Sequence, residues 1–234
     1  MTERHDSRAL NAVEHADMRA EPVAPVPPAV VSERLGEYEQ LLRSYADWLA
    51  GPGTLRGLLG PREIDRLWER HILNSVVLGE LIPHGQRLVD IGSGAGLPGL
   101  AVACVRPDLR VDLVDSLLRR TEFLTEVVGA LGLAGRVRVI RGRAEDKGVI
   151  DAVGSSPFVT ARAVAPLDRL ARWALPLLEQ GGSLLAIKGD AAEAEIAEHG
   201  RNLKRLGAEV RGIEECGQGL VNPVTRVVRV VRVK

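Results

Sequence analysis

The chain has 234 residues, equal numbers of acidic and basic side chains, and 45% hydrophobic residues. This content suffices for one buried core with a modest extension, and no apolar stretch approaches the ~20 residues of a membrane-spanning helix. Residues 1–20 mix acids, bases and histidines without an apolar segment, so we expect no signal peptide, a cytoplasmic protein and no membrane partner. Cys104 and Cys216 lie far apart without metal-ligand spacing, so we expect buried free thiols and no metal site.

The net charge is zero, but the charged residues are unevenly distributed along the chain. Arginine outnumbers lysine 27 to 4, and basic residues cluster within 136–147 and within 225–234. An arginine-rich chain can reflect genome composition with solvated charges, or it can carry a basic face for nucleic acid. Charge alone leaves both interpretations open.

The N-terminal part predicts a tail followed by helices. Residues 1–31 are polar and then proline-rich, which is typical of a disordered tail and a stiff linker. Ser32 is a candidate N-cap for a helix to about Ala50, and Pro61 opens a second helix with His71 on its apolar stripe. We expect residues 32–86 to form a helical cap over the rest of the molecule.

From Arg87 onward, strand and helix patterns alternate. The expected strands are 87–91, 110–115, 136–141, 157–163, 183–188, 208–215 and 225–233. The expected helices are 97–104, 117–131, 166–179 and 191–206. Such alternation predicts a parallel sheet covered on both faces, and the last two strands, joined without a helix, should form an antiparallel hairpin.

A glycine turn after the first of these strands is the strongest chemical signal. The apolar strand breaks at Gly92, Gly94 and Gly96, where the lack of Cβ atoms lets backbone N–H groups approach a ligand. The neighbouring strand ends in Asp115, where a carboxylate can accept hydrogen bonds from a ribose diol. The pair predicts a nucleoside-containing cofactor.

The spacing of the glycines bears on which cofactor this is. A dinucleotide fingerprint requires glycine at position 97, where Leu97 stands. Gly-x-Gly-x-Gly after Asp90 is more similar to the first motif of S-adenosylmethionine-dependent methyltransferases. The hairpin ending is also the methyltransferase variant of the doubly wound fold, whereas a nicotinamide enzyme would need a further substrate domain. A nicotinamide or flavin enzyme and a purely structural turn remain alternatives for the loop itself.

Several motifs together resemble one family in particular, the ribosomal RNA small subunit methyltransferase G family, from about Leu35 to the C-terminus. They are Trp68-Glu-Arg-His-Ile-Leu-Asn-Ser75, Asp90-Ile-Gly-Ser-Gly-Ala-Gly-Leu-Pro-Gly99, Leu113-Val-Asp-Ser-Leu117, Arg141-Gly-Arg-Ala-Glu145, Ala161-Arg-Ala163, Ala186-Ile-Lys-Gly189 and Arg226-Val-Val. Asn74, often aspartate in the family, and the arginine-rich last strand are departures that put fine RNA contacts in doubt.

The resemblance implies a fold and a reaction. The fold would be a Rossmann-like class I methyltransferase α/β fold, with a mostly parallel seven-stranded sheet, a C-terminal antiparallel hairpin and an N-terminal helical cap. Residues 87–234 would be the methyltransferase core, compact with the cap at 32–86. The enzyme would methylate N7 of a guanosine at rRNA position 527 in 16S rRNA, within the 30S subunit and without an obligate protein partner.

The resemblance also implies site residues. Gly92 and Leu97 would border the methionine part of S-adenosylmethionine, Asp115, Ser116 and Leu117 the ribose, Ala144 and Glu145 the adenine, and Arg162 would close the site. For Asp115, an N-cap of the following helix is the alternative, and for Glu145 an ordinary loop acid. Arg162 lies in an otherwise apolar strand and must pair with a carboxylate or meet a ligand. Lys188 and Arg226 are candidates for phosphate contact or plain surface charges.

No residue is assigned as a catalytic acid or base. Guanine N7 carries an in-plane lone pair and no proton, so an in-line displacement needs alignment more than proton transfer. We therefore expect His71 to be a hydrogen-bonded packing residue. The alternatives to this function are a methyltransferase acting on another RNA or small molecule, a nicotinamide-dependent enzyme, and a catalytically idle RNA-binding protein.

Overall fold

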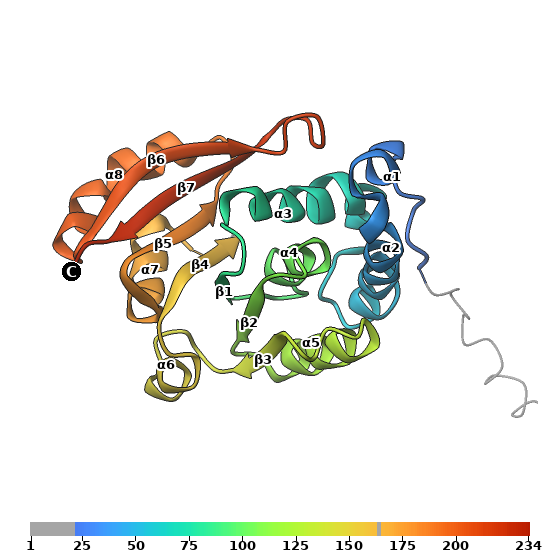
Figure 1. Cartoon of the computed structure of the whole chain (residues 1–234), viewed down its shortest axis with the longest axis horizontal. Coiled ribbons are helices and arrows are strands. Elements are labelled where there is room, and N and C mark those ends of the chain that lie inside the picture. Colours follow the sequence, from blue (N-terminus) through green and yellow to red (C-terminus); the bar gives the residue numbers. More distant parts are fainter. Residues whose placement is uncertain (1–21, 163–164) are drawn as a thin grey trace, which may run out of the picture.

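A seven-stranded sheet in the order β3-β2-β1-β4-β5-β7-β6 runs through the molecule (Figure 1). The computed structural model describes residues 22–162 and 165–234. The five strands from β3 to β5 pair in parallel, whereas β7 is antiparallel to both β5 and β6. The order reverses between β1 and β4, where the ligand crevice of an open α/β sheet lies. The expected sheet and terminal hairpin are thus confirmed.

The bounds of the elements follow the alternating pattern closely. The strands are β1 Arg87–Ile91, β2 Arg110–Asp115, β3 Val137–Arg141, β4 Ser156–Arg162, β5 Leu178–Ile187, β6 Ala208–Cys216 and β7 Thr225–Arg232. The helices are α1 Ala29–Leu35, α2 Glu39–Trp48, α3 Asn74–Val76, α4 Gly99–Val105, α5 Leu118–Ala130, α6 Lys147–Val153, α7 Leu167–Ala174 and α8 Ala192–Arg205. The last residue of the expected strand 157–163 lies outside the described residues.

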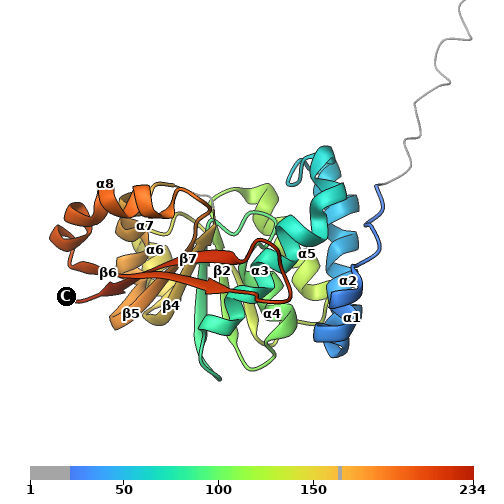
Figure 2. The same cartoon turned by 90° about the horizontal axis from the view of Figure 1, so that it is seen from above.

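Helices cover both faces of the sheet, and each face has its own apolar core. Helices α1–α5 lie on one side and α6–α8 on the other (Figures 1 and 2). Because side chains alternate along a strand, Leu88 packs with the N-terminal helices and α4–α5, whereas Val89 and Ile91 pack with α6–α8. The expected helical cap therefore shares one core with the sheet, and the division into domains at 32 and 87 stays a prediction.

The N-terminal helices begin earlier than expected. Helix α1 starts at Ala29 after Pro28, so Ser32 is not an N-cap, and its hydroxyl donates to Glu39 at 2.6 Å. Proline fits just before a helix because its φ is fixed near the helical value. Residues 22–28 form neither helix nor strand, and Trp68 Nε1 donates to the Pro25 carbonyl at 2.8 Å. This stretch therefore contacts the helices in part, and the stiff proline-rich linker stays a prediction.

Three further boundaries differ from expectation. The helix expected from Pro61 is a run of short helical segments that reaches Leu81. The helix 166–179 ends early, because Pro176 is followed by a strand that begins at Leu178. Helix α6 has no counterpart among the expected helices, since its seven residues include a glycine and three β-branched side chains, which favour other structures.

Both cysteines are buried and unpaired, as expected. Burial raises the pKa of the Cys104 and Cys216 thiols to about 12. Within residues 22–162 and 165–234, no helix combines the length and apolarity needed to cross a bilayer.

Candidate functional site

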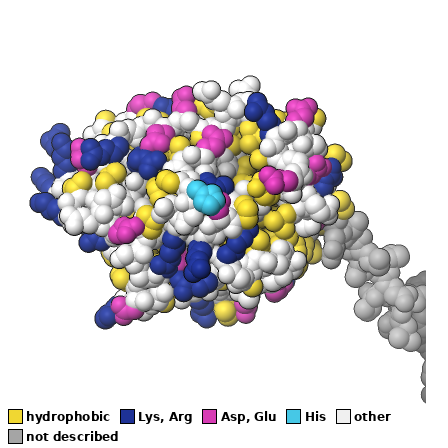
Figure 3. Space-filling view, viewed as in Figure 1, with side chains coloured by type: hydrophobic (Ala, Val, Ile, Leu, Met, Phe, Trp, Pro, Cys, Tyr) yellow, Lys and Arg dark blue, Asp and Glu magenta, His cyan; other side chains and the backbone are white. Residues whose placement is uncertain are grey.

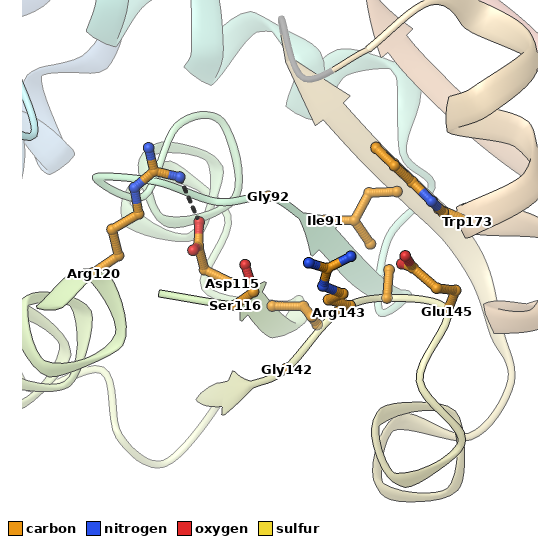
Figure 4. A pocket seen from close by; sticks show the side chains of 11 residues that line it. Ile91, Gly92, Asp115, Ser116, Arg120, Gly142, Arg143, Glu145 and Trp173 are labelled. Carbon is orange, nitrogen blue, oxygen red and sulfur yellow. Dashed lines mark hydrogen bonds and ion pairs between the residues drawn. The ribbon is translucent and has the colours of Figure 1, made fainter. Parts of the chain in front are cut away.

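A cavity of about 210 Å³ opens at the carboxyl ends of β1, β2 and β3 (Figure 4). Each strand contributes the residues where it ends, and α7 adds an indole ring. The lining consists of Ile91, Gly92, Val114, Asp115, Ser116, Arg120, Gly142, Arg143, Ala144, Glu145 and Trp173. Apolar walls with a few charged groups at one rim are typical of a site for a flat heterocycle carrying polar substituents.

The glycine loop uses its own N–H groups internally. The N–H groups of Gly92 and Ser93 both donate to the Val114 carbonyl, and that of Gly94 donates to Asp115 Oδ2 at 3.0 Å. The expectation that these donors face a ligand is therefore wrong for this loop. What the glycines provide is a tight positive-φ path: a Cβ on Gly96 would lie 2.8 Å from both Tyr45 Oη and Leu100 Cβ.

The N-terminus of α4 already has a carboxylate as its partner. Asp90, fully buried at the end of β1, accepts the Gly99 N–H on Oδ2 at 3.0 Å. Its Oδ1 is the one buried side-chain oxygen or nitrogen without a hydrogen-bond partner among the described residues. Burial raises the pKa of Asp90 to about 7, although the Gly99 hydrogen bond favours the charged form. A pyrophosphate at this helix N-terminus would meet that acidic group.

Of the two roles considered for Asp115, the N-cap of α5 is wrong, because Leu117 is the N-cap and has no side-chain capping hydrogen bond, whereas ribose binding stays a prediction. Asp115 lines the cavity, and its Oδ1 also accepts the N–H of Leu117, the residue that precedes α5, at 3.0 Å. Arg120 Nη1 lies 3.2 Å from Oδ2, and Figure 4 shows this pair at the cavity rim. The carboxylate therefore supports the turn and presents its charge to the cavity.

Most of the residues predicted for the cofactor come together in this cavity. Gly92, Asp115, Ser116, Ala144 and Glu145 line it, whereas Leu97, Leu117 and Arg162 do not. Leu97 packs against the core, and Leu117 is 45% exposed beside Ser116.

Five side chains of the lining were not predicted from the sequence, namely the strand residues Ile91 and Val114 together with Arg120, Arg143 and Trp173. Trp173 lies on α7, and Arg120 and Arg143 stand at the rim. Arg143 belonged to the basic cluster noticed in the sequence. Nothing in the local pattern around Trp173 distinguishes it from a core aromatic residue.

Arg162 finds its partners in the helical cap. Its Nη2 lies 2.6 Å from His71 Nδ1, and its Nη1 donates to Ser75 Oγ at 3.1 Å. His71 Nε2 in turn lies 2.7 Å from Glu63 Oε2. The predicted carboxylate partner is wrong for the direct contacts of Arg162, which are with a histidine and a hydroxyl, and Glu63 contacts only His71; a ligand contact stays a prediction.

The two candidates for phosphate contact are both paired within the protein. Lys188 Nζ donates to the Ala165 carbonyl at 2.8 Å and pairs with Glu195, leaving 9% of its side chain exposed. Arg226 forms an ion pair with Glu193 of α8 and keeps 23% of its side chain exposed. Burial and pairing make Lys188 a poor candidate for phosphate contact, whereas Arg226 remains accessible in part.

The basic cluster of residues 136–147 is divided between the two ends of β3. Arg138 joins Arg87 around buried Asp112 at the amino ends of the strands, and Arg136 donates to carbonyls at the end of α4. These contacts neutralise a buried acid and a helix C-terminus, which explains them structurally. Figure 3 shows basic and acidic side chains mixed over one face of the molecule. Arg143, at the other end, faces the cavity.

Comparisons with known proteins agree on one family. The model of the rRNA small subunit methyltransferase G family matches residues 38–224. A ribosomal RNA small subunit methyltransferase G of Mycobacterium marinum is 55% identical over 189 residues, covering 81% of this chain and 82% of the relative. That of Mycolicibacterium smegmatis is 52% identical over 204 residues, covering 87% and 86%.

Solved structures with the same fold are more distant in sequence. An O-methyltransferase from neocarzinostatin biosynthesis, solved with S-adenosylmethionine, gives a TM-score of 0.56 at 19% identity, covering 86% of this chain and 63% of the other. The mitomycin 7-O-methyltransferase gives 0.55 at 18% identity, covering 85% and 67%. These likenesses show the methyltransferase variant of the α/β fold.

Proposed function

This chain belongs to the rRNA small subunit methyltransferase G family, and we propose that it methylates N7 of a guanosine in 16S rRNA with S-adenosylmethionine. The cavity at the carboxyl ends of β1–β3 carries this proposal, together with the carboxylate that occupies the N-terminus of α4. A dinucleotide needs a free helix N-terminus for its pyrophosphate. A cofactor without phosphate needs none, so this site favours S-adenosylmethionine over a nicotinamide cofactor.

The lining fits the parts of that cofactor. Asp115 lines the cavity, where Oδ1 accepts only the Leu117 N–H and keeps a lone pair for one hydroxyl of a ribose. The apolar sides of Ile91, Val114 and Trp173 suit the faces of an adenine, and Glu145 suits its amino group. The space beside Gly94 is open, since a Cβ there would meet only the Gly92 carbonyl oxygen, at 3.9 Å.

The chemistry requires positioning more than proton transfer. When bound, S-adenosylmethionine supplies an electrophilic methyl group on a sulfonium. The residues of this chain then have to orient the donor, align the guanine and exclude water, because N7 attacks through a lone pair and loses no proton. His71 is held between Glu63 and Arg162 and needs no role as a base.

The substrate is proposed to be the rRNA within the 30S subunit, approached from the cavity side of the sheet. Transfer of labelled methyl to purified 30S subunits tests this, with naked 16S rRNA as a second substrate. The expected product is 7-methylguanosine at one position. Binding of NAD in place of S-adenosylmethionine in a calorimetric titration would refute the cofactor, and labelled product on another RNA alone would refute the substrate.

A further inference from the structure

A chain of hydrogen bonds links the surface of the helical cap to the carboxyl end of β4. Glu63, from the segment Pro61–Arg66, contacts His71 Nε2, and His71 Nδ1 contacts Arg162 Nη2. Glu63 has 31% of its side chain exposed, whereas His71 has 10%. The chain therefore leads from solvent into the interior, across residues that lie 91 positions apart.

The donors and acceptors of this chain fix the tautomer of His71. A guanidinium has only donors, so Nδ1 must present its lone pair to Arg162. The ring proton then lies on Nε2 and is donated to the Glu63 carboxylate. Burial lowers the pKa of His71, as does the nearby charge of Arg162, whereas the Glu63 hydrogen bond opposes this shift. The neutral ring is the form that this geometry accommodates.

The same contacts hold Arg162 in one place. Its Nη1 donates to Ser75 Oγ and, at 3.3 Å, to the His71 carbonyl oxygen, while Ser75 Oγ donates to that carbonyl at 2.6 Å. A long arginine side chain loses much rotamer freedom when it binds an anion, and fixing it beforehand reduces that loss. The Nε–H has no hydrogen-bond partner among the described residues, so a donor remains for a ligand.

The position of Arg162 suits the methionine end of the proposed cofactor. Arg162 ends β4, next to β1 and its glycine turn, on the far side of β1 from the ribose carboxylate Asp115. It lies close enough to Asp90 for the two charges to influence each other's pKa. The anionic group of S-adenosylmethionine and its product is a carboxylate, which a guanidinium binds well.

We propose that His71, oriented by Glu63, is a positioning residue that holds Arg162 ready to bind the carboxylate of the cofactor. This inference rests on the proposed function, because it assumes that cofactor. It assigns no proton transfer to His71. Its role is to present an acceptor at Nδ1.

Two replacements of His71 separate this role from packing. Asparagine places an oxygen near the Nδ1 position and can accept from Arg162, although it is smaller than histidine. Glutamine is closer in size but extends its amide toward the Nε2 position and Glu63. If His71 only fills space, the glutamine variant should bind the cofactor product more tightly than the asparagine variant. If His71 positions Arg162, the asparagine variant should bind it more tightly.

The measurement is calorimetric binding of two ligands, S-adenosylhomocysteine and 5′-methylthioadenosine, which lacks the amino-acid part and hence the carboxylate. For His71→Gln we expect affinity for S-adenosylhomocysteine to fall about tenfold, the effect of losing one charge-assisted contact. His71→Asn should stay within about threefold of wild type, and methylthioadenosine affinity should be unchanged in both. Glu63→Ala should weaken S-adenosylhomocysteine binding, while Glu69→Ala, an exposed acid on the same helical run, should not.

The outcomes separate this inference from the proposed function. If glutamine binds S-adenosylhomocysteine as well as asparagine does, or if both ligands weaken together, the positioning role is wrong. If wild-type protein binds neither ligand, the proposed cofactor itself is wrong. Arg162→Ala should reproduce the selective loss of S-adenosylhomocysteine affinity, and a normal affinity there would also overturn the inference.

Discussion

Replacing Asp90 by asparagine tests the unusual state of the carboxyl group beneath the glycine loop. Asp90 is fully buried, one oxygen accepts the Gly99 N–H, and the other has no partner among the described residues. Burial raises its pKa from 3.8 to about 7. Asparagine can still accept the Gly99 hydrogen bond but cannot ionise.

The sign and size of the effect follow from proton linkage. Between pH 4 and pH 7 the folded protein keeps the Asp90 proton that the unfolded chain has lost, so stability falls as pH rises through this window. From the two pKa values, the free energy of unfolding should fall by about 2–3 kcal/mol between pH 5 and pH 8 because of this one group. The new amide N–H group has no partner and costs about 1–3 kcal/mol, but at every pH alike.

The assay is urea unfolding followed by circular dichroism at several values between pH 5 and pH 8, for wild type and Asp90→Asn. Subtracting the two curves removes the contributions of other titrating groups. One of these is His71, because its lowered pKa makes the free energy of unfolding rise with pH as the pH approaches the ordinary histidine pKa from below. The free energy of unfolding of the wild type minus that of the variant should fall by about 2–3 kcal/mol as pH rises from 5 to 8. A difference that stays constant across the range would refute the reasoning, because Asp90 would then have an ordinary pKa.

Three further predictions concern the ligands. Asp115→Ala should weaken S-adenosylmethionine binding by on the order of 1.5–3 kcal/mol in calorimetry. It should also lower the melting temperature, because two backbone N–H groups lose their acceptor. Unchanged affinity would leave Asp115 only its role in the turn. Gly94→Val should abolish cofactor binding. The control Gly132→Val has a similar positive φ and nothing within 4 Å of a Cβ, so it should lower only the stability of the fold. Equal cofactor affinity of the two variants would show that the cofactor does not bind at this loop. Arg226→Ala should reduce methylation of 30S subunits more than Arg229→Ala, with cofactor affinity intact in both variants. Arg229→Ala is the control, because it removes an ion pair with Glu214 on the same strand pair. Equal activity of the two variants across a salt series would contradict a role for Arg226 in RNA contact.

The fold was largely predictable because its signals are local. The alternation of apolar strands with amphipathic helices requires only the period of the pattern, and β1 and β2 have the expected bounds. The errors arose where a segment lacks a strong period. Helix α6 is short and rich in β-branched residues, and α1 begins at Ala29, within the range expected to be tail and linker.

The place of the site was likewise predictable, because parallel strands bring their carboxyl ends to one edge of the sheet. The glycine turn after β1 and Asp115 at the end of β2 had to meet there, and five of the eight residues predicted for the cofactor line the cavity. The lining from α7 was not predictable, since Trp173 reaches the cavity only through the packing of that helix on the sheet.

Tertiary structure alone decided which polar groups are already used. The sequence indicates that the glycine loop has N–H donors, but only the fold shows that the Val114 carbonyl and Asp115 accept from them. It also indicates that Arg162 needs a partner, yet that partner, His71, lies on a different element 91 residues away. A backbone period follows from neighbouring residues, whereas the partner of a long charged side chain depends on which distant elements the fold brings within about 3 Å of it.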